Sequence, residues 1–137
     1  MSSIGSFEAA RKLVTQPGSL LEVGQVEVAG QSLLGDVVAP ARVRALWMLP
    51  TGHGDAACMV YLDERMTYSD AAIRVAAFAS WLQGQGIGPG DRVAIAMRNY
   101  PEWMLAHWAI NAIGAVVVGL NAWWVADEMA YALTDSE

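Results

Sequence analysis

From Ala57 onward, apolar runs typical of buried strands alternate with stretches that have helical spacing. The runs cover residues 57–62, 92–97 and 115–120, and a stretch of helix length separates each run from the next. Strands joined through helices pair in parallel by right-handed crossovers, and the helices cover the sheet. This alternation therefore predicts an α/β fold in which the three runs share one partial, doubly wound parallel sheet with flanking helices.

Local signals mark the ends of the intervening helices. Thr67 and Asp70 have the spacing of a capping box, and the apolar residues after them recur at helical intervals. Pro101 suits the first turn of a second helix, because its missing amide hydrogen has no partner there in any case. The predicted helices run from Thr67 to Gly84 or Gly86, from near Tyr100 to Gly114, and from Asp127 to Leu133.

The first 55 residues have a different pattern. Residues 7–14 predict a short helix, and an alternating stretch that turns at Ala29 and Gly30 predicts a β-hairpin. Segment 41–49, "ARVRALWML", has helical spacing again. Since the sequence has no linker or repeat, we expect one domain in two parts. A leader with a short N-terminal β-hairpin covers about residues 1–55, and an α/β subdomain covers about residues 56–137.

Composition limits the partners and the compartment. The net charge of −6 disfavours a nucleic-acid partner, because binding phosphates requires a basic face, and the sequence has no polybasic cluster to hold an anionic membrane surface. Cys58 is the only cysteine, which excludes an intrachain disulfide and fits a reducing compartment. The first residues lack the pattern of a signal peptide. We expect a cytoplasmic protein, with peripheral association at a membrane as the alternative.

One segment is long enough to cross a bilayer. Residues 103–126 contain no Asp, Glu, Lys or Arg. His107, Asn111 and two glycines interrupt the segment, and no cation follows closely on its C-terminal side to anchor an orientation. We interpret the segment as buried core of the α/β fold and predict no transmembrane segment.

The glycine-rich stretch "GQGIGPG", residues 84–90, superficially resembles a dinucleotide-binding loop. It follows a predicted helix and precedes a predicted strand, whereas phosphate-binding loops lead from a strand into a helix. His53 and His107 have no cysteine or carboxylate at the spacing of metal ligands, and no serine lies in a nucleophile-elbow motif. We therefore predict no catalytic residue and no metal site in this chain.

Polar and aromatic residues directly follow the last predicted strand. Asn121, Ala122, Trp123 and Trp124 come after the apolar run 115–120. Because parallel α/β sheets bind ligands beyond the carboxyl ends of their strands, these four residues are the candidate binding residues. Packing of the two indoles against another domain or subunit remains an equal alternative, since exposed apolar groups usually mark an interface.

Several linked motifs carry a resemblance to a known family. They are Thr67-Tyr68, Arg74-Val75, Pro89 to Val93, Asn99, Pro101 to Trp103, Gly114 to Val118 and Asp135-Ser136. With these motifs the chain resembles, from about Leu20 onward, the N-terminal part of the larger N-terminal domain of adenylate-forming acyl-CoA synthetases, also called AMP-binding enzymes. One departure is Gly119, where the family usually has proline.

The resemblance implies an activity for a longer parent enzyme. The family forms an acyl-adenylate from a carboxylic acid and ATP with Mg²⁺, and then transfers the acyl group to coenzyme A. The resemblance implies a fatty or other apolar acid as substrate, and it places the loop with Asn121, Ala122, Trp123 and Trp124 near the path of the CoA pantetheine. The family's phosphate loop, adenine-binding motifs and catalytic lysine would lie beyond Glu137. We therefore expect this chain to be an inactive N-terminal fragment that binds no cofactor tightly.

Two alternatives stay open. The chain could be a stand-alone flavodoxin-like binding or interaction module, or its parent could pass the acyl group to a carrier protein instead of CoA. We also expect self-association into a homo-oligomer, because a sheet cut before its next strand leaves an edge and an apolar helix face uncovered.

Overall fold

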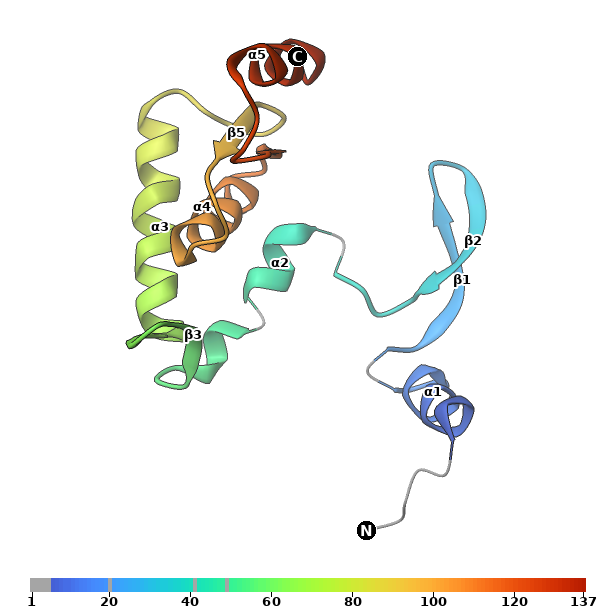
Figure 1. Cartoon of the computed structure of the whole chain (residues 1–137). Helices are drawn as coiled ribbons and strands as arrows, with labels where there is room; N and C mark the ends of the chain where they lie inside the picture. Colours follow the sequence, from blue (N-terminus) through green and yellow to red (C-terminus); the bar gives the residue numbers. More distant parts are fainter. Residues whose placement is uncertain (1–5, 20, 41, 49) are drawn as a thin grey trace. The chain divides into compact units, whose positions relative to one another are not determined.

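The computed structural model describes residues 6–19, 21–40, 42–48 and 50–137 (Figure 1). The chain divides into two compact units, Met1–Ala41 and Arg42–Glu137. Ala41 and Leu49, which end the predicted helical segment 41–49, lie outside the described residues. The expected division near residue 55 stays a prediction.

The first unit contains a helix and a hairpin. Helix α1 (Phe7–Thr15) begins after Ser6, whose hydroxyl oxygen accepts from the Ala9 amide at 3.2 Å. Strands β1 (Val23–Val28) and β2 (Gln31–Asp36) pair antiparallel. The turn residues Ala29 and Gly30 have φ of 50° and 77°, and two positive φ angles match the twist of a tight hairpin. The predicted hairpin is confirmed.

The second unit holds the remaining elements. In chain order they are α2 (Val43–Met48), the 3₁₀ helix η1 (Pro50–His53), β3 (Ala57–Tyr61), β4 (Glu64–Thr67), α3 (Tyr68–Gly84), β5 (Arg92–Ala96), α4 (Pro101–Ala112), β6 (Val116–Leu120) and α5 (Ala126–Asp135). The capping box of α3 is present, since the Asp70 amide donates to Thr67 Oγ1 at 3.0 Å and the Thr67 amide donates to Asp70 Oδ2 at 3.2 Å.

Strands β5 and β6 form the predicted parallel pair. Their register runs from Arg92 opposite Val116 to Ala96 opposite Leu120, and α4 makes the crossover between them. This unit therefore confirms the α/β class, and it places the carboxyl ends of both strands at one edge.

The expectation that residues 57–62 join the same sheet is wrong. Strand β3 pairs antiparallel with β4, and within the described residues these two strands form a sheet of their own. Leu62, with φ of 54°, lies in a tight turn that brings β4 directly back beside β3. Pairing across so short a loop loses little chain entropy, so the local partner is favoured over a distant strand.

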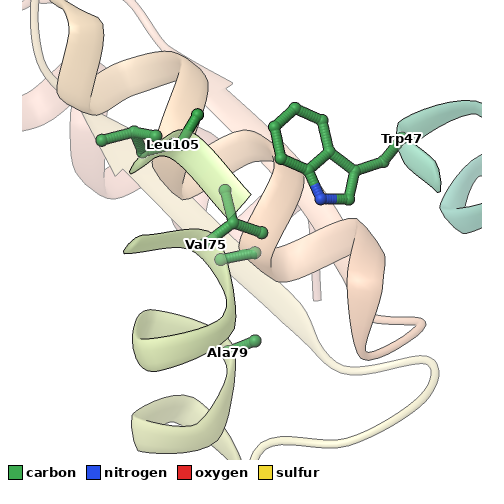
Figure 2. Close-up of a cluster of buried hydrophobic side chains, with 6 residues drawn as sticks. Trp47, Val75, Ala79 and Leu105 are labelled. Carbon is green, nitrogen blue, oxygen red and sulfur yellow. The ribbon is translucent and has the colours of Figure 1, made fainter. Parts of the chain in front are cut away.

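The core lies between α3, α4 and the parallel pair. One cluster of buried side chains includes Trp47, Val75, Ala79 and Leu105 (Figure 2). A second cluster joins Leu82 of α3 to Ile95, Ile110 and Ala115 around β5 and β6. Small residues on α3 and α4, such as Ala71 and Ala109 with no exposed surface, allow the two helices to pack closely.

The loops that precede β5 and β6 are joined at the amino edge of this sheet. The Gly90 amide donates to the Gly114 carbonyl at 3.0 Å, and the Val116 amide donates to the Asp91 carbonyl at 2.7 Å. Gly114 has φ of +81°, and a Cβ built there would lie 3.3 Å from Cβ of Pro89. Only glycine meets both conditions without strain, so Gly114 is required for this junction.

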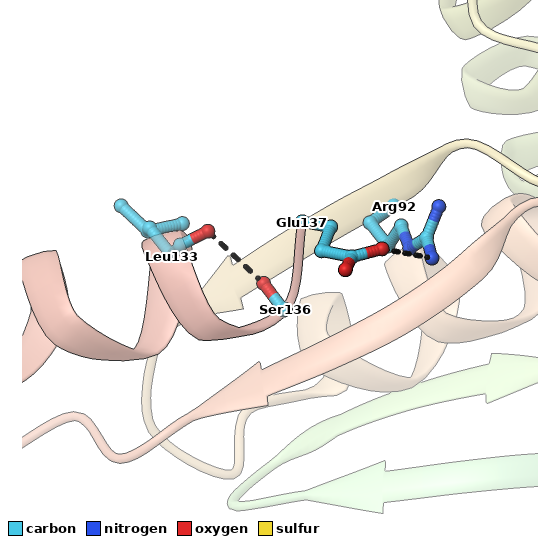
Figure 3. A network of polar contacts seen from close by, with 4 residues as sticks. All are labelled: Arg92, Leu133, Ser136 and Glu137. Carbon is cyan, nitrogen blue, oxygen red and sulfur yellow. Dashed lines mark hydrogen bonds and ion pairs between the residues drawn. The ribbon is translucent and has the colours of Figure 1, made fainter.

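Helix α5 returns toward the start of β5. The Glu137 carboxylate lies 3.3 Å from Arg92 Nη2, and the Ser136 hydroxyl donates to the Leu133 carbonyl (Figure 3). Both partners of the ion pair are exposed, so it contributes little to stability. No side chain of α5 is buried. None of the helices in the described part of the chain is both long and apolar enough to cross a membrane.

Candidate functional site

A cleft of about 570 Å³ opens where β5 and β6 end. The loop after β6 supplies all four residues predicted from the sequence, and the loop after β5 supplies the opposite wall. The lining residues are Met97, Arg98, Asn99, Trp103, Gly119, Leu120, Asn121, Ala122, Trp123 and Trp124. Parallel pairing thus brings two loops that are distant in the sequence to one edge.

Asn121 shapes the loop after β6. Its side-chain oxygen accepts from the Trp123 amide at 3.0 Å, and its backbone carbonyl accepts from the Trp124 amide at 3.1 Å. A side-chain oxygen that accepts two residues ahead is the usual way in which Asn fixes a tight turn. Asn121 therefore holds the orientation of the loop that carries both indoles.

The two walls meet through one aromatic contact. The Arg98 guanidinium carbon lies 3.9 Å from the centre of the Trp123 ring, within the range of a cation–π interaction. Trp123 is nevertheless 72% exposed. A large indole held in place by a cation, yet open to solvent, offers a planar apolar surface to a ligand.

Trp103 of α4 forms part of the cleft wall and packs against other aromatic rings. Its ring stacks on His107 at 5.3 Å between centroids, and His107 meets Trp108 edge-on. Burial lowers the pKa of His107, and its buried Nδ1 has no hydrogen-bond partner within the described part of the chain. His107 is therefore a neutral ring that supports Trp103, as expected for a core or interface histidine.

The charged residues that line this cleft differ from those of a neighbouring hollow. Arg98 is the only charged residue among those that line the cleft, although the chain has a net charge of −6. A second hollow of about 620 Å³, between β6 and α5, contains Asp127, Glu128 and Asp135. Trp124 lines both spaces. An anionic ligand is therefore favoured in the cleft and disfavoured in the second hollow.

The cleft has room for a ligand, and none of the described residues that line it is a His, Cys, Asp or Glu. The described residues include no group of three or more His, Cys, Asp or Glu that could hold a metal ion. The pKa of Asp70 is lowered by its hydrogen bonds with Thr67, which assigns this carboxylate to helix capping. The glycine-rich stretch 84–90 runs from the last residue of α3 into the loop before β5, at the opposite end of β5 from the cleft.

The sequence prediction missed the wall formed by Met97, Arg98, Asn99 and Trp103. A signal for part of it was present, because Arg98 and Asn99 directly follow the predicted strand 92–97. The rule that selected the loop after the last strand applies equally to this loop.

The family model described as AMP-binding enzyme matches residues 47–137. A long-chain-fatty-acid–CoA ligase of Salmonella typhimurium is 36% identical over 87 residues, which are 63% of this chain and 16% of that protein. A feruloyl-CoA synthase of an Amycolatopsis species is 39% identical over 71 residues, which are 52% of this chain and 14% of that protein. The chain thus spans a small part of the length of these relatives.

Solved structures with the same fold include a protein of Klebsiella oxytoca. Its NpsA N-terminal subdomain, in complex with 3-hydroxyanthranilyl-AMSN, matches with a TM-score of 0.65 and 26% identity, over 68% of this chain and 24% of that chain. An artificial fusion of the same protein, described as an adenylation–PCP di-domain, matches with a TM-score of 0.65 and 26% identity, over 68% of this chain and 18% of that chain.

Proposed function

Because this chain belongs to the AMP-binding enzyme family, we propose that it serves as the N-terminal part of an ATP-dependent acid–thiol ligase. The whole enzyme would activate a fatty or other apolar carboxylic acid as an acyl-adenylate and transfer the acyl group to coenzyme A. Both curated relatives described above are named as CoA ligases or synthases, which supports CoA as the acceptor. The family match also favours a ligase over a stand-alone binding module.

The cleft at the carboxyl edge of β5 and β6 is the observation that carries this proposal. Arg98 is the one cation among the described residues that line the cleft, none of these residues is a carboxylate, and Trp123 is an exposed ring. Coenzyme A combines phosphates, an adenine ring and a thin pantetheine arm. A guanidinium suits phosphate, and an indole face suits a planar ring or an apolar arm. We assign Asn121, Ala122, Trp123 and Trp124, together with Arg98, to the CoA side of the enzyme.

The residues of this chain do not fit ATP or Mg²⁺. The described residues lack a carboxylate cluster for the metal, and the glycines at 84–90 precede a strand instead of a helix. In the proposed enzyme, adenylation therefore depends on residues other than those described here. The contribution of this chain is to bind and orient the acceptor, and we expect no turnover from the 137 residues alone.

A carrier protein is the second candidate acceptor. The NpsA structures that match the fold of this chain include one described as an adenylation–PCP di-domain. Offering CoA and a carrier protein bearing a phosphopantetheine arm to the same enzyme separates the two candidates. Faster thioester formation on the carrier would replace the CoA assignment.

The decisive experiment compares two half-reactions in the native polypeptide that includes this chain. ATP–pyrophosphate exchange measures adenylation, and thioester formation measures acyl transfer. Trp123→Ala and Arg98→Gln should each raise KM for CoA about fivefold to tenfold, consistent with the loss of one cation–π or charge-assisted contact, and leave exchange unchanged.

Trp81→Ala is the matched control, because Trp81 is also an exposed indole, at 57%, but lies on α3 and does not line the cleft. An unchanged KM for CoA in both cleft variants would contradict the assignment of the cleft. Absence of exchange activity with every carboxylic acid would contradict the ligase itself. Pyrophosphate release by the 137-residue chain would show that the chain contributes more than acceptor binding.

A further inference from the structure

A separate groove lies among the helices of the second unit. It has a volume of about 510 Å³, and α2, α3 and the end of α4 line it. Trp47 forms a rigid wall, because it is only 6% exposed and stacks on Trp108 at 5.2 Å between centroids. Figure 2 shows Trp47 extending from α2 toward the α3 face that carries Val75 and Ala79. The groove shares no lining residue with the cleft at the carboxyl edge of the sheet.

The lining of this groove is apolar apart from its rim. Along α3, Ala72, Ala76 and Ala79 leave space above the helix backbone, and Ile113 continues the apolar surface at the end of α4. The uncharged polar residues of the lining, Ser80 and Gln83, lie together near the C-terminal end of α3. A narrow aliphatic chain fits such a surface, since burial of each methylene contributes about 0.8 kcal/mol.

One cation stands at the rim. Arg44 is exposed, is the only charged residue of the lining, and has no hydrogen bond or ion pair within the part of the chain that the structure describes. The lining contains no carboxylate, although the chain has 14 acidic residues and only 8 Lys and Arg residues. The groove therefore complements a ligand with a negative head and an apolar tail.

We propose that this groove binds a single-chain aliphatic carboxylate, with the carboxylate on Arg44 and the alkyl chain along α3 beneath Trp47. A guanidinium can hold both carboxylate oxygens at once, and the apolar wall accepts a chain without polar atoms. A cationic amphiphile would meet Arg44 with like charge. The site is independent of the proposed CoA cleft and of the ligase activity.

Calorimetric titration of the 137-residue chain with dodecanoate, below its critical micelle concentration, tests the proposal. We expect saturable binding, weakened about tenfold by Arg44→Gln, which corresponds to about 1.4 kcal/mol. Arg42→Gln is the matched control, because Arg42 is an exposed arginine just before the same helix but does not line the groove. Acetate, which lacks the alkyl chain, should not bind.

Two further variants locate the site. Ala76→Leu places a larger side chain in the groove, and it should weaken binding while circular dichroism shows that α3 is intact. Arg98→Gln, in the other cleft, should leave binding unchanged. Equal affinity for dodecyltrimethylammonium, dependence on Arg98 instead of Arg44, or no saturable binding below the micelle concentration would each overturn the proposal.

Discussion

The two edges of the β5–β6 pair differ in how their loops are held. At the amino edge, two backbone hydrogen bonds join the loops, and Pro89 covers Gly114. At the carboxyl edge, the loops meet through the contact of Arg98 with Trp123, and no hydrogen bond joins residues 97–100 to residues 121–125 in the described structure. Backbone hydrogen bonds thus join the loops at the amino edge, whereas a side-chain contact joins them at the carboxyl edge.

This difference separates stability from binding within one small sheet. Backbone hydrogen bonds in a tight junction resist change, because every buried or crowded amide needs its partner. Side chains at an open edge can be replaced with little effect on the fold, and they are free to contact a ligand. We expect substitutions at the amino edge to destabilise the chain and those at the carboxyl edge to alter binding.

The largest effect should come from Gly114→Ala. Alanine at φ of +81° is strained by about 1–2 kcal/mol, and its Cβ would press on Pro89 at 3.3 Å, so we expect a loss of about 2–3 kcal/mol in the free energy of unfolding. Urea denaturation followed by circular dichroism measures it. Gly84→Ala is the control, because Gly84 has open space around it and no positive φ. Equal stability of Gly114→Ala and wild type would contradict the claim that the amino edge stabilises the fold.

A much smaller change is expected from Trp123→Ala at the carboxyl edge. The side chain is 72% exposed, and its loss removes one exposed cation–π contact, so the free energy of unfolding should fall by about 0.5 kcal/mol. The same denaturation assay applies. A loss as large as that of Gly114→Ala would mean that the carboxyl edge also holds the fold together.

The smallest expected effect is on the pH dependence of stability, and it comes from His107, whose ring stacks on Trp103. Burial lowers the pKa of His107 from its ordinary 6.5, so protonation favours the unfolded chain. The stabilisation is fully present above pH 6.5 and is lost as pH falls through the lowered pKa. His107→Phe keeps an aromatic ring against Trp103, and it should flatten this part of the stability profile between pH 7 and pH 5. An unchanged slope would show that another group titrates.

Local signals predicted most elements of the fold, but not β4 and not all of the strand partners. The capping box of Thr67 and Asp70 was found from sequence because both residues lie within one turn of chain. The partner of β3 was not, because an apolar run specifies burial and not the strand beside it. The short strand β4 was missed, since Glu64 and Arg65 lack the apolar alternation by which strands are recognised.

Prediction of the candidate site is limited in the same way, because its two walls are distant in the sequence. Asn121 to Trp124 follow directly from the rule for parallel sheets. The contact of Arg98 with Trp123 depends on the register of β5 against β6, which no local pattern reports. Sequence reasoning therefore predicted one wall of the cleft, and the pairing of the strands supplied the other.

The weak packing of α5 limits the time for which this helix stays folded. None of its side chains is buried, and the one ion pair in the described part of the chain joins its carboxyl end to β5 through exposed Glu137 and Arg92. An isolated helix of 10 residues is marginal in water and forms and melts within about a microsecond. Its amide hydrogens should exchange with solvent long before those of α4, whose side chains are packed in the core. We therefore expect α5 to open independently while the β5–β6 sheet stays folded.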